Sequence, residues 1–88
     1  MSGFEWDESK RKLNIAKHGI DFQDAVEVFG DPEVLTLRFA GEHDEPRFLA
    51  IGRCQGRIIA VIFTVMGETI RLISARAARR EERQRYES

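Results

Sequence analysis

The feature that most constrains this chain is a change in the spacing of its apolar residues near residue 30. Before that point, an apolar stripe begins at Phe22 and recurs at i+3, i+4 and i+7, which predicts one face of a helix. After it, apolar residues come in short runs separated by Gly-containing turns, which predicts strands joined as hairpins. We therefore expect helices in the first third of the chain and a sheet after them.

Two helices are expected before the change. Asp7 is a good N-cap for a helix over about residues 8–18, and Gly19 supplies a left-handed stop. Asp21 caps the second helix, which Gly30-Asp31-Pro32 ends. The expected inward residues of the first helix are Trp6, Leu13 and Ala16.

Four strands and a last helix follow in the prediction. The short turns, Gln55-Gly56 among them, favour an antiparallel meander, and the most apolar strand should lie in its middle. The expected strands span residues 34–39, 47–54, 57–65 and 69–75, and the helix spans 77–86. The whole chain, 1–88, is thus predicted to be one α+β domain, with two N-terminal helices packed on a four-stranded antiparallel sheet and a C-terminal helix.

Composition places the protein among cytoplasmic globular proteins. Apolar residues make up 42% and charged residues 33% of the chain, which is typical of a folded soluble domain. The longest apolar run, 58–66, is too short to cross a bilayer, and the N-terminus does not resemble a signal peptide. One cysteine, Cys54, cannot form an internal disulfide. We expect a cytoplasmic location and no membrane contact.

The net charge of −1 conceals two opposite halves. Residues 1–50 hold six Lys/Arg against eleven Asp/Glu, a net −5, while residues 51–88 hold eight Arg against four Glu, a net +4. Every cation of the second half is arginine, whose planar fork of donors matches phosphate or carboxylate. Such a division indicates a polyanion or an acidic protein as partner, although a solvated face with helix-stabilising ion pairs is an equally good interpretation for the last segment.

Several kinds of chemistry lack their motifs. The two histidines and the cysteine are too far apart in sequence for a zinc site, and no phosphate-binding glycine loop or nucleophile elbow is present. We expect neither a metal nor a cofactor. His43 is interpreted as an exposed loop residue.

What remains is a set of arginines near strand ends. Arg53 and Arg57 flank one turn, and Arg76 follows the last strand, with Arg79 close behind it. Guanidinium groups gathered at one sheet edge would hold a phosphodiester and stabilise charge that develops on it during cleavage. Arginine at strand ends is also common without any such role.

Proton transfer has one good candidate and two weaker ones. His18 can act as an acid or base near neutral pH, yet a histidine at a helix end is also favoured by the helix dipole. Tyr86 can move a proton or stack on a base, or simply anchor the last helix. Glu68 lies in a turn, where it is either a general base beside the arginines or an exposed residue without a role.

Longer motifs resemble a known family. The matching segments are Glu5-Trp6-Asp7-Glu8, Lys17-His18-Gly19, Asp31-Pro32, Arg47-Phe48-Leu49-Ala50-Ile51-Gly52 and Ile70-Arg71-Leu72-Ile73-Ser74-Ala75-Arg76, followed by Glu82-Arg83 and Tyr86. Together they resemble the BrnT toxins over nearly the whole chain.

The resemblance implies a function. BrnT-like proteins are the toxin half of a bacterial type II toxin–antitoxin pair, have a RelE-like fold, cleave RNA without a metal and inhibit translation. It implies an RNA substrate and a BrnA-like DNA-binding antitoxin in a hetero-oligomer. It also implies a catalytic set of Arg76, His18, Arg53 and Arg79, and leaves Glu68, Arg57 and Tyr86 as further candidates for catalysis or RNA binding.

We therefore expect an endoribonuclease that uses the ribose 2′-hydroxyl as nucleophile. The alternative is a non-catalytic module whose arginine-rich half binds an acidic protein or a nucleic acid.

Overall fold

The computed structural model describes residues 3–39, 41 and 45–88, and over these residues one five-stranded sheet carries three α-helices and a 3-10 turn. His43 lies outside the described residues. In chain order the elements are β1 (Gly3–Glu5), α1 (Glu8–His18), α2 (Phe22–Ala25), the 3-10 turn η1 (Val26–Gly30), β2 (Leu35–Arg38), β3 (Phe48–Cys54), β4 (Arg57–Met66), β5 (Thr69–Ala77) and α3 (Arg80–Glu87). No helix among them is long and apolar enough to cross a membrane.

The sheet is mixed, with the strand order β1-β5-β4-β3-β2. Strands β2 to β5 form the expected antiparallel meander, and β4 lies in its middle. The prediction of a purely antiparallel, four-stranded sheet missed β1, which pairs in parallel with β5 through Gly3 and Thr69. A strand of three residues is too short to show an alternating pattern, and its partner lies at the other end of the sequence.

Both ends of α1 were predicted correctly. The Asp7 carboxylate accepts a hydrogen bond from the Ser9 backbone N–H at 2.8 Å, as an N-cap does. Gly19 has a φ of 71° and donates its N–H to the Ile15 carbonyl at 2.8 Å. An L-residue would be strained in that left-handed conformation, which is why glycine ends the helix.

The inward face of α1 differs from the prediction. Trp6 packs on the core as expected, but Ala16 is exposed and Leu13 is 68% exposed. The buried residue is Asn14, whose side-chain amide donates to the Ala75 carbonyl at 2.9 Å and accepts from the Ala75 N–H at 3.0 Å. Because β1 pairs with β5 only as far as Arg71, the Asn14 side chain takes the place of the missing strand neighbour.

The second helix is shorter than predicted and tightens into a 3-10 turn after Ala25. A 3-10 helix has three residues per turn, so side chains three apart share a face. Phe22, Ala25 and Val28 are accordingly the fully buried residues, whereas Val26 and Phe29, expected in the stripe, are only half-buried.

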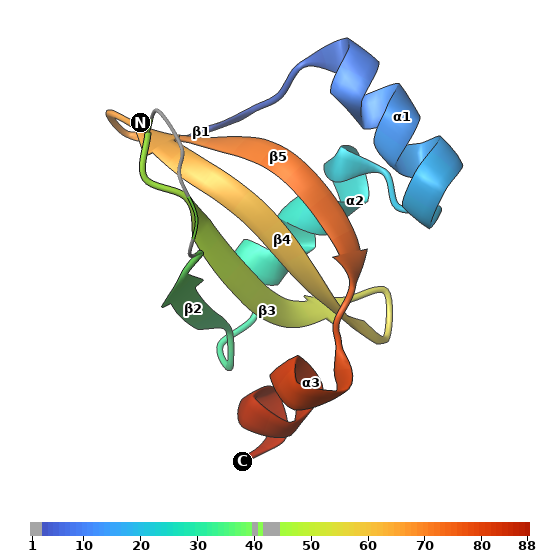
Figure 1. Cartoon of the computed structure of the whole chain (residues 1–88), viewed down its shortest axis with the longest axis vertical. Coiled ribbons are helices and arrows are strands. Elements are labelled where there is room, and N and C mark those ends of the chain that lie inside the picture. Colours follow the sequence, from blue (N-terminus) through green and yellow to red (C-terminus); the bar gives the residue numbers. More distant parts are fainter. Residues whose placement is uncertain (1–2, 40, 42–44) are drawn as a thin grey trace.

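The sheet has two different faces, named here for the helices that lie on them. The α2 face is covered by α2 and η1, which lie behind the sheet in Figure 1, whereas α3 lies below one end of the opposite, α3 face and α1 flanks the β5 edge. The apolar cluster on the α2 face includes Phe22, Val28, Ala50, Val61, Phe63 and Leu72. The cluster on the α3 face consists of Leu49, Ile51, Ala60, Ile62 and Ala78, with Tyr86 and Ile73 packed against it.

A β-bulge decides which face carries Arg76. Strict alternation along β5 would place Arg76 on the same side as Leu72. However, the register shifts within the β4–β5 pair, so that Ile62 pairs with Ser74 while its neighbour Phe63 pairs with Leu72. The extra residue reverses the alternation, as bulges do. Arg76 therefore lies opposite Ala60, on the α3 face.

Candidate functional site

Arg53 and Arg76 lie on the α3 face on either side of β4. Arg53 of β3 pairs with Ile58, and Arg76 of β5 pairs with Ala60, so the two arginines flank the central strand near the end that α3 covers. Residues paired across a sheet point to the same face. The structure thus brings together two of the four residues expected to be catalytic.

Arg76 is held by α3. Its guanidinium donates two hydrogen bonds to the Glu82 carboxylate, at 2.8 and 3.0 Å, and each side chain is only 15% exposed. These hydrogen bonds hold the pKa of Glu82 below its ordinary value, so the carboxylate stays ionised and acts as an acceptor rather than an acid. Two of the five guanidinium N–H donors of Arg76 are thereby committed to Glu82.

Arg53 is held by the next turn of the same helix. Tyr86 follows Glu82 by four residues and so shares its helix face, and the Arg53 guanidinium lies 5.7 Å from the centre of its ring. The Tyr86 hydroxyl donates to Asp31 at 2.6 Å, which raises the pKa of the tyrosine and lowers that of the aspartate. Tyr86 therefore keeps its proton at neutral pH and anchors α3 in this structure.

Asp31 and Glu82 are the two residues of this site that sequence reasoning missed as members. Asp31 also accepts the Arg53 backbone N–H at 2.8 Å, so one carboxylate connects η1, β3 and α3. In the sequence, Asp31 stands out as part of the Gly30-Asp31-Pro32 helix end and of the family resemblance, and neither feature predicts its contacts with β3 and α3. Glu82 lies six residues after Arg76, a separation that indicates an ion pair only once the strand-to-helix turn is known.

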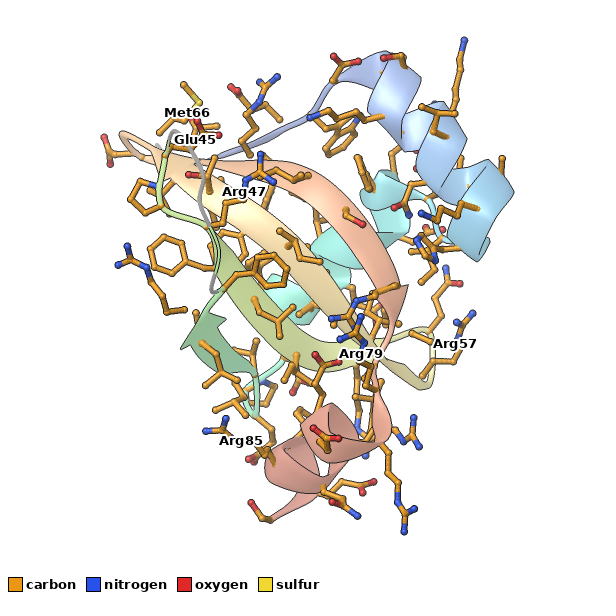
Figure 2. The ribbon with its side chains drawn as sticks, viewed as in Figure 1. Glu45, Arg47, Arg57, Met66, Arg79 and Arg85 are labelled. Carbon is orange, nitrogen blue, oxygen red and sulfur yellow. The ribbon has the colours of Figure 1, made fainter. Side chains whose placement is uncertain are left out.

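The other two predicted arginines, Arg79 and Arg57, lie at different places relative to this pair. Arg79 begins the last helix, where its backbone N–H donates to Glu82 at 2.8 Å, and Figure 2 shows its side chain at the end of β5. Arg57 pairs with Cys54 and so belongs to the α2 face, and in Figure 2 it extends outward from the β3–β4 turn. Arg79 therefore lies at the same end of the sheet as Arg53 and Arg76, whereas Arg57 lies on the opposite face.

Glu68 and His18 lie at separate places. Glu68 is in the β4–β5 turn, at the opposite end of a ten-residue strand from Arg57, which corresponds to ~30 Å. His18 ends α1 and lines a groove between α1 and β5 together with Ser74, which shares the α3 face with Arg76. The structure does not bring Glu68 to the arginines, and it brings His18 to the neighbouring edge of the sheet.

A second pair of arginines lies on the α3 face at the end remote from α3. Arg71 pairs with Thr64 and forms a 2.5 Å ion pair with Glu5. Arg47, which precedes β3 on the other side of β4, has a buried Nε without a hydrogen-bond partner in the structure. Figure 2 shows it at the same end of the sheet as Met66 and Glu45. The arginines of this face are thus divided between its two ends.

The described residues were compared with the ligand sets that metal ions use in proteins. Within the described parts of the chain, no group of three or more His, Cys, Asp or Glu side chains is arranged to hold an ion. Cys54 is buried, and burial raises the pKa of its thiol, which disfavours the reactive thiolate.

The sequence around this site matches a known protein family. The model of the ribonuclease toxin BrnT, of type II toxin–antitoxin systems, matches residues 6–82. The chain belongs to the BrnT family. A search of the curated proteins found no match. Membership of the BrnT family implies an RNA substrate and a protein antitoxin, and the matched span includes Arg53, Arg76 and Glu82 but stops before Tyr86.

Proposed function

We propose that this BrnT-family protein is a metal-independent endoribonuclease that cleaves RNA by attack of the ribose 2′-hydroxyl and thereby inhibits translation. The observation that carries the proposal is the placement of Arg53 and Arg76 on one sheet face, with both side chains oriented by α3, in a chain of a ribonuclease toxin family. Arginines fixed in advance stabilise developing phosphoryl charge without reorganising during the reaction.

Arg76 is the group proposed to meet the scissile phosphate. Glu82 occupies one edge of its guanidinium, so the phosphate would use the N–H donors that remain. Arg79, at the start of α3, would contact the same phosphate or its neighbour. Arg53 has less freedom because its cation–π contact with Tyr86 orients it.

His18 is proposed as the group that moves protons. An RNA strand crossing β5 from Arg76 would pass Ser74 and reach His18 at the end of α1. The base removes the 2′-hydroxyl proton, the resulting oxygen forms a bond to phosphorus, and the bond to the 5′-oxygen breaks as that oxygen gains a proton. The products are a 2′,3′-cyclic phosphate and a 5′-hydroxyl. General acid–base transfer of this kind contributes ~10²–10⁴-fold.

The biological setting follows from the same proposal. A BrnA-like DNA-binding antitoxin would hold the toxin in a cytoplasmic hetero-oligomer until the antitoxin is lost. Tyr86 is assigned an anchoring role for α3, since its hydroxyl is taken by Asp31.

Growth of bacteria that express the toxin without antitoxin tests the role of Arg76. We expect wild type to arrest growth and Arg76→Ala to relieve the arrest, because loss of one such donor generally costs ~10²–10³ in rate. Arg85→Ala is the matched control: it removes an exposed arginine of α3, the helix that holds Arg76 (Figure 2), and should remain toxic.

Equal arrest by wild type and Arg76→Ala would remove Arg76 from the mechanism. Because Arg76→Ala also breaks the ion pair with Glu82, its thermal unfolding must be compared with that of Glu82→Gln, which breaks the same pair and keeps the arginine. Wild-type protein that binds RNA but never cleaves it would favour a non-catalytic binding module instead.

A further inference from the structure

The face of α1 that borders β5 is apolar, basic and uncovered. Lys10, Leu13, Asn14 and Lys17 fall at i, i+3, i+4 and i+7, so they share one face of the helix. Of these four only Asn14 is buried, and Leu13 is 68% exposed. A large apolar side chain exposed to this degree on a fixed helix gains stability when another molecule covers it.

The orientation of this face is fixed by the fold. The Asn14 side chain makes three hydrogen bonds to backbone groups, the Ala75 N–H, the Ala75 carbonyl and the Ile20 carbonyl, at 2.9 to 3.0 Å. Rotating α1 to bury Leu13 would pull the amide away and leave those buried backbone groups unpaired, at a cost larger than the gain. Leu13 therefore stays exposed in the isolated protein.

A groove of about 530 Å³ lies between this helix face and β5. Its apolar lining comes from Leu13 and Ala16 of the helix and Ile73 of the strand, and its cations are Lys10 and Lys17. His18 and Ser74 complete the wall nearest the arginines. The groove can take apolar side chains on its floor and carboxylates beside its lysines.

We infer that this groove is the docking site of the toxin's protein antitoxin, and that the antitoxin fills it with an amphipathic segment whose apolar residues are flanked by Asp or Glu. The identity of the occupant rests on the proposed function, since a type II toxin has a protein antitoxin as partner. The chemistry of the segment rests on the groove: Leu13, Ala16 and Ile73 need apolar contacts, and the two lysines need carboxylates.

Two other occupants fit less well. RNA would meet an apolar floor with two lysines, whereas single-stranded RNA requires a line of cations with stacking surfaces. A second copy of this chain, docked by the same face about a two-fold axis, would bring the lysines of both copies, Lys10 and Lys17, into one interface. Like charges placed together across an interface disfavour association.

Occupation of the groove would also explain neutralisation. The segment would lie over His18, the group proposed to move protons, and would block the path of RNA from Arg76 across Ser74. The antitoxin would then inhibit the enzyme by covering part of its site, without needing to displace α3.

The experiment pairs toxicity with rescue in bacteria that express the toxin from one promoter and its own antitoxin from another. Leu13→Asp and Lys17→Glu place a carboxylate in the groove, and Lys12→Glu makes the same charge reversal on α1 outside it. We expect all three variants to remain toxic alone. Antitoxin should rescue cells that carry wild type or Lys12→Glu, and should fail to rescue the two groove variants.

Binding of the purified antitoxin to each toxin variant gives a second readout that does not need toxicity. Isothermal titration should show Leu13→Asp binding about 30-fold or more weakly, as is typical of a central interface residue, and Lys12→Glu binding within a few-fold of wild type. If wild type is not toxic, the ribonuclease proposal fails, while this titration still tests the surface.

Rescue and binding of Leu13→Asp and Lys17→Glu at wild-type levels would overturn the inference. So would groove variants that change the oligomeric state of the free toxin while leaving antitoxin affinity unchanged, since the face would then join two copies. Circular dichroism shows whether each variant folds, and Lys17→Glu keeps the test valid if Leu13→Asp does not.

Discussion

Asn14 occupies a position beside β5 that a strand neighbour would otherwise fill. Its short amide side chain presents an N–H donor and a carbonyl acceptor at the spacing of a peptide group, so it can pair with both backbone groups of Ala75. The same contacts hold α1 against the sheet edge and expose Leu13. One polar residue thus decides which face of an amphipathic helix is left for a partner.

Asn14→Leu should therefore be strongly destabilising although it adds an apolar side chain at a buried position. We expect a loss of ~2–4 kcal/mol in the free energy of unfolding, because three backbone groups lose their hydrogen-bond partner. Urea unfolding of wild type and Asn14→Leu measures this difference in stability. Leu13→Ala on the same helix should change stability by less than ~0.5 kcal/mol. The opposite order would mean that Leu13, not Asn14, is the packed residue.

Gly52 is a second residue whose size matters. A Cβ there would lie 2.9 Å from Val28 Cγ1 and 3.2 Å from Asp31 Oδ2, so Gly52→Ala should force η1 away from β3 and cost ~1–3 kcal/mol. Gly30→Ala is the control, since a Cβ at Gly30 meets nothing within 4 Å. The loss of stability should appear as a lower urea midpoint, with an unchanged dependence of the unfolding free energy on urea concentration. A Gly52→Ala variant as stable as wild type would contradict the close approach of η1 to β3.

At the scale of elements, the features that the sequence predicted correctly are those set by neighbouring residues. The caps Asp7 and Asp21, the stop at Gly19 and the Gln55-Gly56 turn all depend on residues next to one another, and the structure confirms each. β1, the bulge in β5 and the exposure of Leu13 depend on pairing between distant parts of the chain. No local pattern carries that information. Asp31 and Glu82 were not predicted as members of the candidate site because their contacts also depend on how separate elements pack together.

The attachment of α3 should depend on pH through its carboxylates. Glu82, ordinarily near a pKa of 4.5, has a lowered pKa because Arg76 donates to it, and Asp31, ordinarily near 3.8, has a lowered pKa because Tyr86 does. A lowered folded-state pKa adds stability above the unfolded value, and that stability is lost as pH falls through the folded value. The contribution of both residues is therefore complete above about pH 4.5 and is lost as the pH falls below it.

Glu82→Gln isolates part of this effect. It should lower stability at pH 7, and the difference from wild type should shrink as the pH falls below 4.5, where wild type loses the same charge. Unfolding measured at pH 7, 5, 4 and 3 gives the comparison. A difference that is constant over this range would show that the charge of Glu82 does not hold Arg76.

At the scale of the whole molecule, cations from both halves of the chain lie beside β5. The first half has a net −5, yet its helix α1 carries the lysines of the groove. In the +4 half, Arg53 and Arg76 lie near the α3 end of the α3 face and Arg71 lies near its other end. RNA contact and antitoxin contact would meet at the edge of β5. This arrangement lets one partner exclude the other without a change of fold.

The most direct test of this account is incubation of the purified protein with RNA in excess chelator, followed by chemical mapping of the new ends. The account predicts cleavage that leaves 2′,3′-cyclic phosphate and 5′-hydroxyl ends, with the rate falling ~10²–10³-fold in Arg76→Ala and unchanged in Arg85→Ala. RNA that stays intact, ends bearing a 3′-hydroxyl and a 5′-phosphate, or wild-type rates in Arg76→Ala would contradict it.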